Sequence, residues 1–386
     1  MPSGAAVVRR EGKRGVSWCL KYRDAVGKQV WETLGREPEW SEARAQRELG
    51  KRLQAVERDR WRKPERIAFA AFAERWEADY LPGRNLKPST VSDYGSIIRG
   101  HLVPHFGHLA LAALEPADVD GYVAAQAAAG LSPKTIRNHL ALLGVMLKVA
   151  RRWRLTTADP LAEVEPPRVE QPEMQVLTEA EIARLLTAYR ELEREAEPAE
   201  REWWALSRRL VEVALGTALR RGELLALRWR GVELLEGRLH VREALVRGRF
   251  GAPKSRNSRR MLELGPRTAA TLQEQWQASR YRADECLVFC HPALGSPLDP
   301  SKLSRAYMRP ALKRAAITKP FRPWHDLRHT ALTHEAAAGN PQAYVQLKAG
   351  HSQGSITERY IHAAQVLFPG AAARGEERMF GGAGRL

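Results

Sequence analysis

A proline-rich segment divides the sequence into two halves. The segment EPPRVEQPEMQ, residues 165–175, contains three prolines and shows no apolar periodicity. Such a composition is typical of an extended linker rather than of a helix or a strand. Directly after it, Thr178 and Glu181 have the spacing of a capping box, which predicts that a new domain begins there with a helix. A chain of 386 residues has room for two or three domains.

The net charge of the chain predicts a polyanionic partner. The sequence holds 62 lysines and arginines against 45 aspartates and glutamates, a formal charge of +17, and nucleic acid is the commonest polyanion that such a charge attracts. Charge alone leaves open a ribosome-adhering protein or a merely basic one. Charge also does not distinguish a protein that only binds DNA from an enzyme that acts on DNA.

Two further features of the sequence set the expected compartment. The sequence lacks a run of about 18 apolar residues that could span a bilayer, and the segment MPSGAAVVRREGKRG lacks the apolar centre of a secretory signal. The three cysteines form neither a disulfide framework nor a paired zinc-ribbon pattern. We therefore expect an intracellular protein without membrane contact, located in the cytoplasm and associated with the nucleoid.

Residues 1–62 predict a small basic module made of a sheet and a helix. Polar and apolar residues alternate on both sides of a turn at residues 24–27, which predicts a β-hairpin, and from Ser41 the apolar residues recur with helical spacing. Trp18 and Trp31 are predicted to lie in the core of the module rather than to stack on bases. Such a module could place one face of its sheet in a DNA groove. Its candidate DNA contacts are the cations of the first tract, Arg9, Arg10, Lys13 and Arg14.

Residues 66–164 predict a domain of four helices. The candidate helices are IAFAAFAERWEADYL, a stretch that begins at Pro88, PADVDGYVAAQAAAG, and SPKTIRNHLALLGVMLKVARRW. Ser132 and Pro133 suit the start of the last helix. Ser132 can cap the helix, and the missing N–H of Pro133 costs nothing at the first helical position. That helix carries cations suited to phosphate contacts, although a solvated face would look similar. They are Lys134, Arg137, Lys148, Arg151 and Arg152.

The remainder of the chain predicts a larger, mostly helical domain over residues 176–364. The helical segment LSRRLVEVALGTALRRGELLALRW is followed by two strand-like segments, RLHVRE and RRMLELG, on either side of the turn RGRFGAPKSRNS. Residues 365–386 form a tail rich in glycine and alanine. The expected fold class is therefore mainly α with small antiparallel β-sheets, an α+β protein of three domains, a linker and a tail.

Several polar residues in the second half could carry chemistry. Arg220 and Glu223 lie three residues apart, so the carboxylate can orient the guanidinium, whose two parallel donors suit phosphate. His325 and Arg328 have the same spacing and would share a helix face. Each of these signals also has a structural explanation, such as an ordinary ion pair or a capped helix. A metal is a further alternative because His325 and His329 lie four apart, but no third ligand with suitable spacing follows.

Three other residues complete the set of candidates. Lys254 lies at the tip of the predicted hairpin, where a lysine is ordinarily solvated. His351 and Tyr360 lie nine residues apart in AGHSQGSITERYIH, whose glycines predict a loop before a short helix that carries the tyrosine. A single tyrosine in such a place is ordinarily a packing residue.

The order of these residues resembles that of the tyrosine recombinase, or phage-type integrase, family. An arginine with an acidic partner is followed by a lysine on a hairpin, His-x-x-Arg, Gly-His and a tyrosine. The match extends from about residue 176 to residue 364 and rests on TALRRGELLALRW, HDLRHT and AGHSQGSITERYIH. The helical region before the linker resembles the family's core-binding, SAM-like domain, and the first module is similar to the arm-binding domain of many integrases.

The resemblance implies a site-specific DNA recombinase that needs no cofactor and no metal. It implies cleavage and rejoining of DNA through a covalent 3′-phosphotyrosine, in the service of integrating or excising a mobile element or prophage. Glu223 would orient Arg220, and Tyr360 would be the nucleophile. The catalytic residues that the resemblance implies are Arg220, Lys254, His325, Arg328, His351 and Tyr360.

The implied partners are DNA attachment sites and further copies of the chain. In the family, four protomers on two DNA sites exchange strands through a Holliday junction, with accessory DNA-bending or directionality proteins in some systems. The sequence departs from the family pattern at two positions. Ala218 stands where glycine is usual before the first catalytic arginine, and Ala349 stands where leucine commonly precedes Gly-His.

Two alternatives to a recombinase remain at this point. One is a catalytically silent DNA-binding regulator with the same fold, against which the intact set of six catalytic positions counts. The other is a type IB-like topoisomerase, which shares the nucleophile chemistry but relaxes DNA, and the arm-like first module favours recombination over it.

Overall fold

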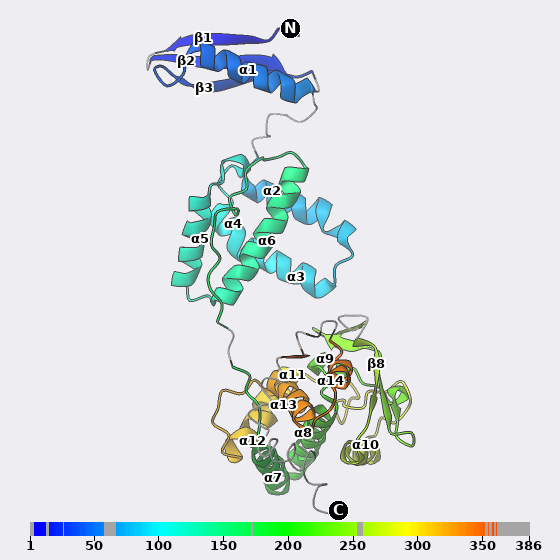
Figure 1. The fold of residues 1–386 in the computed structure, drawn as a ribbon. Helices are drawn as coiled ribbons and strands as arrows, with labels where there is room; N and C mark the ends of the chain where they lie inside the picture. The colour runs from blue at the N-terminus through cyan, green and yellow to red at the C-terminus, as the bar shows by residue number, and fades with distance from the viewer. Residues whose placement is uncertain are drawn as a thin grey trace, which may run out of the picture. The chain divides into compact units, whose positions relative to one another are not determined.

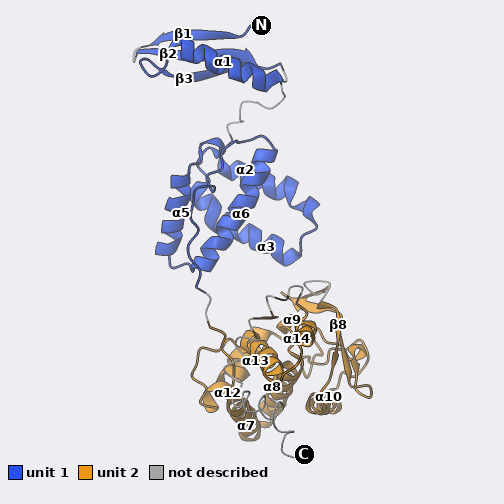
Figure 2. Cartoon of the chain, in the orientation of Figure 1, with its two compact units in different colours: residues 1–170 blue, residues 171–386 orange. Residues whose placement is uncertain are grey.

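The computed structural model divides the chain into two compact units, Met1–Glu170 and Gln171–Leu386 (Figure 2). The boundary between them lies within the proline-rich segment. The structure describes residues 4–12, 15–25, 27–57, 67–170, 173–252, 258–351, 354, 357–358 and 360.

The first part of unit 1 is a three-stranded antiparallel sheet with one helix (Figure 1). Its elements are β1 (Ala6–Gly12), β2 (Gly15–Arg23), β3 (Gln29–Arg36) and α1 (Glu42–Glu57). Leu20, Tyr22 and Val30 of the sheet and Leu49 of the helix form its apolar core. The expected hairpin of β2 and β3 is confirmed, but the basic tract before it forms a third strand that its low apolar content did not reveal.

The two tryptophans of this sheet differ in burial. Trp18 is 6% exposed, as predicted, whereas Trp31 is 39% exposed, so its predicted core position is wrong. Successive residues of a strand point to opposite faces, and because Val30 packs in the core with α1, the next residue points away from it. The guanidinium of Arg10 lies 4.7 Å from the centroid of the Trp31 ring. The predicted DNA contacts Lys13 and Arg14 lie outside the described residues.

The second part of unit 1 is helical. Its elements are α2 (Phe69–Arg75), η1 (Trp76–Tyr80), η2 (Pro82–Arg84), α3 (Pro88–Ile97), η3 (Ile98–Leu102), α4 (Val103–Phe106), η4 (Leu111–Ala113), α5 (Pro116–Ala128) and α6 (Pro133–Arg152). Aromatic side chains such as Phe69, Trp76 and Tyr122 are fully buried at the centre. Ser132 caps α6 as predicted, because its Oγ accepts a 3.2 Å hydrogen bond from the N–H of Thr135.

The described part of unit 2 is built mostly of helices, with two small sheets. Its helical elements are α7 (Glu179–Glu195), α8 (Pro198–Thr217), α9 (Arg221–Leu225), η5 (Trp229–Gly231), α10 (Pro266–Ala278), α11 (Pro300–Leu303), η7 (Ser304–Met308), α12 (Arg309–Arg314), α13 (Pro323–Ala337) and α14 (Gln342–Ala349). Its strands are β4 (Val232–Glu233), β5 (Arg238–Val241), β6 (Ala244–Val246), β7 (Arg249–Gly251) and β8 (Arg260–Glu263). The expected α+β class is confirmed. Within the part of the chain that the structure describes, no helix has the length and apolarity needed to cross a bilayer.

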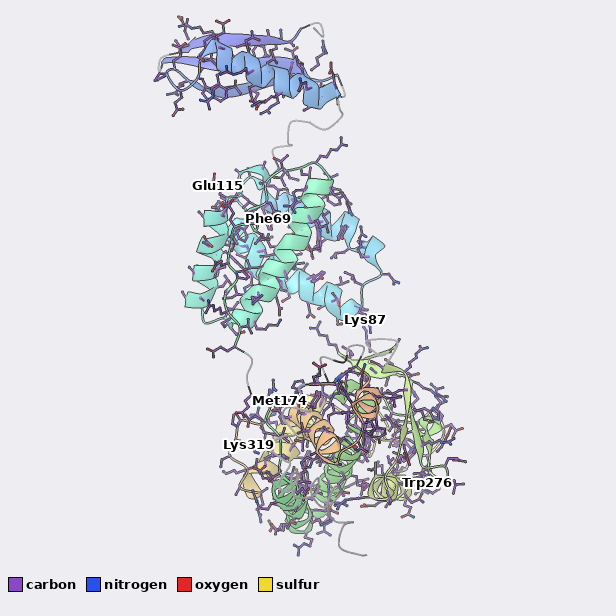
Figure 3. The ribbon with its side chains drawn as sticks, in the orientation of Figure 1. Phe69, Lys87, Glu115, Met174, Trp276 and Lys319 are labelled. Carbon is purple, nitrogen blue, oxygen red and sulfur yellow. The ribbon has the colours of Figure 1, made fainter. Side chains whose placement is uncertain are left out.

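The start of unit 2 is fixed by the predicted capping box. The Oγ1 of Thr178 accepts from the N–H of Glu181 at 3.2 Å, and Oε2 of Glu181 accepts from the N–H of Thr178 at 2.8 Å. Lys319, labelled in Figure 3, donates to that same carboxylate at 2.6 Å and to the carbonyl oxygen of Val176 at 2.8 Å. The incoming chain is therefore anchored before α7 begins.

Helix α8 is the element around which unit 2 packs, since α7, α10 and α13 all contact it. The segment predicted as one helical run is in fact two helices. The first, α8, ends at Thr217 and is followed by the C-cap residue Ala218, which has a left-handed backbone with φ of 53°; the second, α9, starts at Arg221. This break places Arg220 at the N-cap of α9 rather than inside a continuous helix.

The two predicted strands after α9 pair as expected. Strands β5 and β8 are antiparallel, with Leu239 opposite Leu262, and both leucines are buried. Strand β4 pairs with the other edge of β5, and between β5 and β8 in the sequence lies a separate two-stranded sheet of β6 and β7. Lys254, predicted for the tip of this hairpin, lies outside the described residues.

Candidate active site

Arg220 is the N-cap residue of α9, with an extended backbone rather than a helical one. Its partner Glu223 closes a capping box around it. Oε2 of Glu223 accepts from the backbone N–H of Arg220 at 3.1 Å, and Oε1 accepts from Nη1 of the guanidinium at 2.9 Å. The carboxylate therefore fixes both ends of the arginine, a tighter arrangement than the helical ion pair expected from the spacing.

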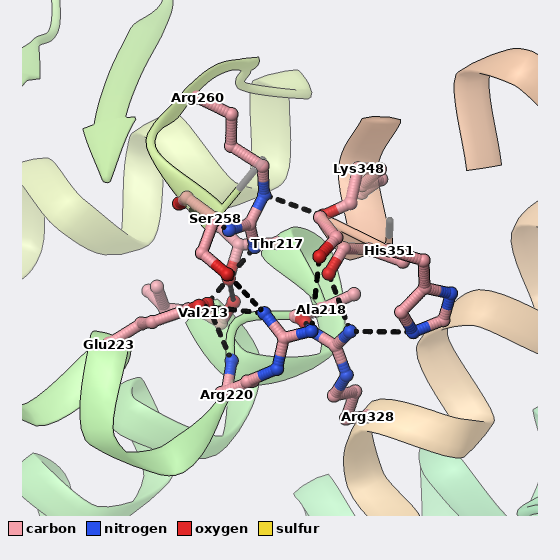
Figure 4. Close-up of polar contacts among 12 residues, drawn as sticks. Val213, Thr217, Ala218, Arg220, Glu223, Ser258, Arg260, Arg328, Lys348 and His351 are labelled. Atoms are coloured by element: carbon pink, nitrogen blue, oxygen red, sulfur yellow. Dashed lines mark hydrogen bonds and ion pairs between the residues drawn. The ribbon is translucent and has the colours of Figure 1, made fainter. Parts of the chain in front are cut away.

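Arg260, at the start of β8, shares the same carboxylate (Figure 4). Its Nη2 lies 3.1 Å from Oε2 of Glu223, and the two side chains are 4% and 2% exposed. Burial alone would raise the pKa of Glu223, but Arg260 and Arg220 outweigh it and lower that pKa, so the carboxylate stays ionised. Sequence reasoning missed Arg260, because strand alternation does not reveal which helix a strand residue faces.

Arg260 also joins the hairpin to α14. Its Nε donates to the carbonyl oxygen of Lys348 at 2.9 Å, and its Nη1 donates to that of Ser258 at 3.0 Å. The hydroxyl of Ser258 in turn accepts from Nη1 of Arg220 at 3.2 Å. Three segments that are distant in sequence are thus held together by one buried polar network.

Arg328, on α13, is held by backbone groups. Its Nη1 donates to the carbonyl oxygen of Ala218 and its Nη2 to that of Ala349, each at 2.6 Å. These carbonyls lie at the C-terminal ends of α8 and α14, where unpaired C=O groups and the helix dipole favour a cation. Arg220 similarly donates to the carbonyl oxygen of Gly350 at 3.1 Å.

The guanidinium of Arg328 stays protonated although its side chain is buried. The side chain is 7% exposed, and burial together with the nearby Arg220 lowers its pKa to about 10. A guanidinium with that pKa remains protonated at neutral pH. Among its hydrogen-bond partners in the described residues there is no carboxylate, so its positive charge is available to an anion.

His351 follows the C-cap of α14 and is 7% exposed. Nη2 of Arg328 lies 3.2 Å from its Nε2, and Oγ1 of Thr357 lies 3.1 Å from its Nδ1. Because arginine can only donate, Nε2 of the histidine accepts and Nδ1–H donates to the threonine. Burial, then Arg328 and Arg220, lower the pKa of His351 to about 4, so the ring is neutral at pH 7.

His325 and His329 form a second histidine pair on α13. Their Nε2 atoms are 2.8 Å apart, and His325 is exposed whereas His329 is 8% exposed. Burial and the neighbouring His325 lower the pKa of His329 to about 4. Sequence reasoning gave His329 no catalytic role, although its spacing of four from His325 placed it on the same face.

Tyr360 lies between two histidine rings. Its ring stacks on that of His351 with centroids 5.8 Å apart and an interplanar angle of 15°, and lies 5.4 Å from the ring of His329. The side chain is 4% exposed and packs with apolar residues that include Ala218 and Leu332. The ring of Tyr360 is thus buried in the same site that contains Arg220 and Arg328.

These side chains surround a cavity of about 1210 Å³. Its lining includes six arginines and three histidines, and among the described residues it includes no aspartate or glutamate. Such a cavity attracts an anion and can neutralise a growing negative charge. The charged and reactive residues in the lining are Arg220, Arg221, Arg305, Arg309, Arg322, Arg328, His325, His329, His351 and Tyr360.

One group in this region has donors that a metal ion could use. Ligand atoms of His325, Asp326 and His329 lie within 4.8 Å of one another, so the structure supplies the third ligand that spacing did not suggest. However, Asp326 is fully buried and already forms an ion pair with Arg322 at 2.8 Å. The arginines of the cavity also repel a dication, so the geometry favours an anion over a metal.

Two of the DNA contacts predicted in unit 1 already form ion pairs within the chain. Arg9 forms an ion pair with Glu11, and Arg151 forms one with Asp159 at 2.5 Å, so part of their charge is already neutralised. The other predicted cations of α6 are exposed along that helix. They are Lys134, Arg137, Lys148 and Arg152.

Two family models match the sequence. The Phage integrase family matches residues 175–366, and the N-terminal SAM-like domain of phage integrases matches residues 68–125. Together they cover most of the helical part of unit 1 and nearly all of the described part of unit 2. The predicted family resemblance is confirmed.

Similar proteins of known name include recombinases and integrases. The tyrosine recombinase XerC of Mesorhizobium japonicum is 27% identical over 318 residues, which cover 79% of this chain and 95% of that protein. The prophage phiRv2 integrase of Mycobacterium tuberculosis is 28% identical over 310 residues, covering 77% of this chain and 75% of that protein.

Solved structures with the same fold include two integrases bound to DNA. The Tn1549 transposon integrase in complex with a circular intermediate DNA has a TM-score of 0.64 and 17% identity, and covers 76% of this chain and 94% of that one. The lambda integrase tetramer bound to a Holliday junction has a TM-score of 0.59 and 18% identity, covering 91% and 94%. The chain belongs to the phage integrase family of tyrosine recombinases, which break and rejoin DNA.

Proposed function

We propose that this recombinase integrates or excises a mobile element at specific DNA sites through a covalent 3′-phosphotyrosine. One observation carries the assignment of the site. Arg220, Arg328 and Tyr360 line a single cavity whose described lining contains no carboxylate. A phosphodiester is the group of DNA that such a cavity fits.

The two arginines would neutralise the charge that builds up on the non-bridging oxygens as phosphorus becomes five-coordinate. Both are fixed before the substrate arrives, Arg220 by Glu223 and Arg328 by two carbonyl oxygens. Preset donors need no reorganisation during the reaction, which lowers the barrier. His351 would add a hydrogen bond after taking up a proton at Nε2, which the phosphate anion favours.

The Oη atom of Tyr360 would attack phosphorus and form the phosphotyrosine bond while the bond to the 5′ oxygen breaks. The proton of the phenol would pass to a histidine, with His325 as the predicted base and His329 as its hydrogen-bonded neighbour. Lys254 would protonate the departing 5′ oxygen. The phosphodiester energy stays in the covalent intermediate, so rejoining requires no nucleotide cofactor.

The assembly that we propose is a tetramer of this chain on two DNA attachment sites. The fold similarity to an integrase tetramer on a Holliday junction supports it. Accessory DNA-bending or directionality proteins and a cytoplasmic, nucleoid-associated location belong to the same proposal. The chain without residues 365–386 would test whether this tail contributes to synapsis.

A covalent-capture experiment tests the function. Nicked suicide duplexes are cut from the DNA on either side of the gene and from its candidate attachment sites, and incubated with the protein and with Tyr360→Phe. We expect a protein–DNA adduct that denaturing gels resolve and that the variant lacks. Phenylalanine keeps the packing of the ring and removes only the attacking oxygen.

The other outcomes favour the competing functions. No adduct on any duplex, together with retained DNA binding, would indicate a catalytically silent DNA-binding regulator. Adducts on DNA of arbitrary sequence, relaxation of a supercoiled plasmid and no exchange between two sites would indicate a topoisomerase-like activity.

A further inference from the structure

Three arginines of the cavity are not accounted for by the chemistry of a single phosphodiester. Arg220, Arg322 and Arg328 are held by Glu223, Asp326 and backbone carbonyls respectively. Arg221, Arg305 and Arg309 also line the cavity, and each is exposed. None of these three forms an ion pair or a side-chain hydrogen bond with another described residue. Their charges therefore act on whatever enters the cavity.

Other arginines of unit 2 do form ion pairs with carboxylates. Arg208 pairs with Glu274 at 2.6 Å, Arg230 pairs with Glu285 at 2.6 Å, and Arg314 pairs with Glu195. Arg314 is the closest comparison, because it lies on α12 together with Arg309. Arg314, whose charge is neutralised by Glu195, lies outside the cavity lining. Arg309, which has no acidic partner among the described residues, lies within it.

The geometry of the chain places Arg305 and Arg309 side by side. Arg305 lies in the π-turn η7, and Arg309 begins α12 directly after it. Residues four apart on a continuous helical path lie on neighbouring parts of one face. Ser301 and Ser304 belong to the same wall of the cavity. The hydroxyl of Ser304 donates to the carbonyl oxygen of Pro300 at 2.8 Å, so the donors that this wall offers to phosphate oxygens are its two guanidinium groups and the hydroxyl of Ser301.

We propose that Arg305 and Arg309 form a second phosphate-binding site, which holds a backbone phosphate next to the one that Tyr360 attacks. The inference rests on the proposed function and adds a binding site to it. Arg220 and Arg328 hold the scissile phosphate, and the second site fixes the direction of the strand through the cavity. Positioning of this kind places phosphorus in line with Tyr360 without contact to any base.

The salt dependence of DNA binding tests the site without any strand cleavage. The full chain, Arg305→Ala/Arg309→Ala and Lys313→Ala bind a labelled 30-base-pair duplex of arbitrary sequence over a range of salt concentrations. Lys313 is the matched control, since it is an exposed cation of α12 outside the cavity lining. We expect the magnitude of the slope of log K against log salt to fall by about 0.9 in the double variant, because each neutralised phosphate contributes roughly 0.9. We expect the slope of Lys313→Ala to equal that of the unmodified chain.

A pair of small ligands tests whether the cavity holds two phosphates at once. Thymidine 3′,5′-bisphosphate carries two phosphates at the spacing of a DNA strand, and thymidine 5′-monophosphate carries one. We expect the full chain to bind the bisphosphate about tenfold more tightly, the effect of one additional charge-assisted contact. This preference should disappear in Arg305→Ala/Arg309→Ala and persist in Lys313→Ala. Thermal unfolding confirms that the variants are folded.

The possible results distinguish a failure of the second phosphate-binding site from a failure of the proposed recombinase function. An unchanged salt slope and an unchanged preference for the bisphosphate in the double variant would overturn the second site. If both change while no suicide duplex ever forms an adduct, the second site stands and the recombinase assignment of Tyr360 fails. A loss of slope in Lys313→Ala equal to that of the double variant would indicate a diffuse surface effect and would also overturn it.

Discussion

Arg328 donates a 2.6 Å hydrogen bond to the carbonyl oxygen of Ala218, the C-cap residue of α8. Ala218 has φ of 53°, a left-handed backbone that ordinarily favours glycine. It is also fully buried beside Tyr360. The turn that ends α8 therefore orients one proposed catalytic residue and packs against another.

Replacement of Ala218 should show how closely the site depends on this turn. Ala218→Gly removes backbone strain of about 1 kcal/mol but also loses a buried methyl group worth about 0.8 kcal/mol, so the free energy of unfolding should change by less than about 1 kcal/mol. Ala218→Val adds a β-branched side chain to a buried, left-handed position and should cost about 2–4 kcal/mol.

Denaturant unfolding measures both variants, and adduct formation on a suicide duplex measures the site. Ala218→Gly should retain adduct formation, whereas Ala218→Val should lose most of it because the carbonyl moves away from Arg328. Equal stability of the two variants would contradict a strained, closely packed turn.

Arg260 should contribute to both stability and catalysis. Arg260→Met leaves Glu223 buried with one cation instead of two, and breaking a buried ion pair of this kind costs about 3 kcal/mol. Adduct formation should also fall, because the carboxylate that orients Arg220 can then shift. The change in unfolding free energy and the rate of adduct formation are measured together.

A double variant separates the two effects of Arg260. Glu223→Gln/Arg260→Met removes the buried charge along with its partner, so its loss of stability should be smaller than the sum of the two single losses. Its adduct formation should remain low. Strict additivity of the two stability losses would show that the side chains do not interact.

The stability of the protein should fall as the solution becomes acidic. His329 and His351 each have a folded-state pKa of about 4, below the usual value of about 6.5 for an unfolded chain. Between these values the unfolded state binds more protons, so stability is fully present above pH 6.5 and is lost as the pH falls toward about 4. The slope should reach about 1.4 kcal/mol per pH unit for each histidine.

Unfolding curves at several pH values measure this slope. His329→Gln removes one of the two groups and should reduce the slope by about one proton between pH 6.5 and about 4. A slope that is the same in the variant would show that His329 is not the group that titrates.

Removal of divalent metals should leave the reaction unchanged. In the proposed mechanism, the arginines that line the cavity would supply the positive charge that a metal would otherwise bring to the phosphate. The amount of adduct should therefore be the same in plain buffer, in excess EDTA, and in a sample to which zinc was added and then removed. Loss of the adduct in EDTA, and its return with zinc, would instead assign a metal to the group of His325, Asp326 and His329.

Local spacing in the sequence predicted the parts of the site that lie within one turn of helix. The pairing of Arg220 with Glu223 and the placement of His325 and Arg328 on one helix depend only on residues three apart. The role of Arg260 could not be predicted in this way, because it depends on contact with Glu223 37 residues earlier and with Lys348 88 residues later. The same is true of the carbonyl oxygens around Arg328, since backbone acceptors leave no trace in residue identity.

In the fold, too, features that depend on neighbouring residues were predictable, whereas features that depend on distant contacts were not. Capping by Thr178 and Ser132 was predictable, because side chains cap the helix that follows them. The exposure of Trp31 was not, because it depends on which face of the sheet α1 covers. At Ala218 the sequence pointed to an unusual residue, and the left-handed backbone gives the physical reason why glycine suits that position.

The acceptors that hold Arg328 have a consequence for how the site can change over evolution. A carboxylate partner can be deleted by a single codon change, but a backbone carbonyl is present whichever amino acid occupies the position. The hold on Arg328 therefore depends on where α8 and α14 end rather than on the chemistry of a partner side chain. It is vulnerable to insertions and deletions, because one additional residue in α8 or α14 would turn the terminal carbonyl by about 100° around the helix axis.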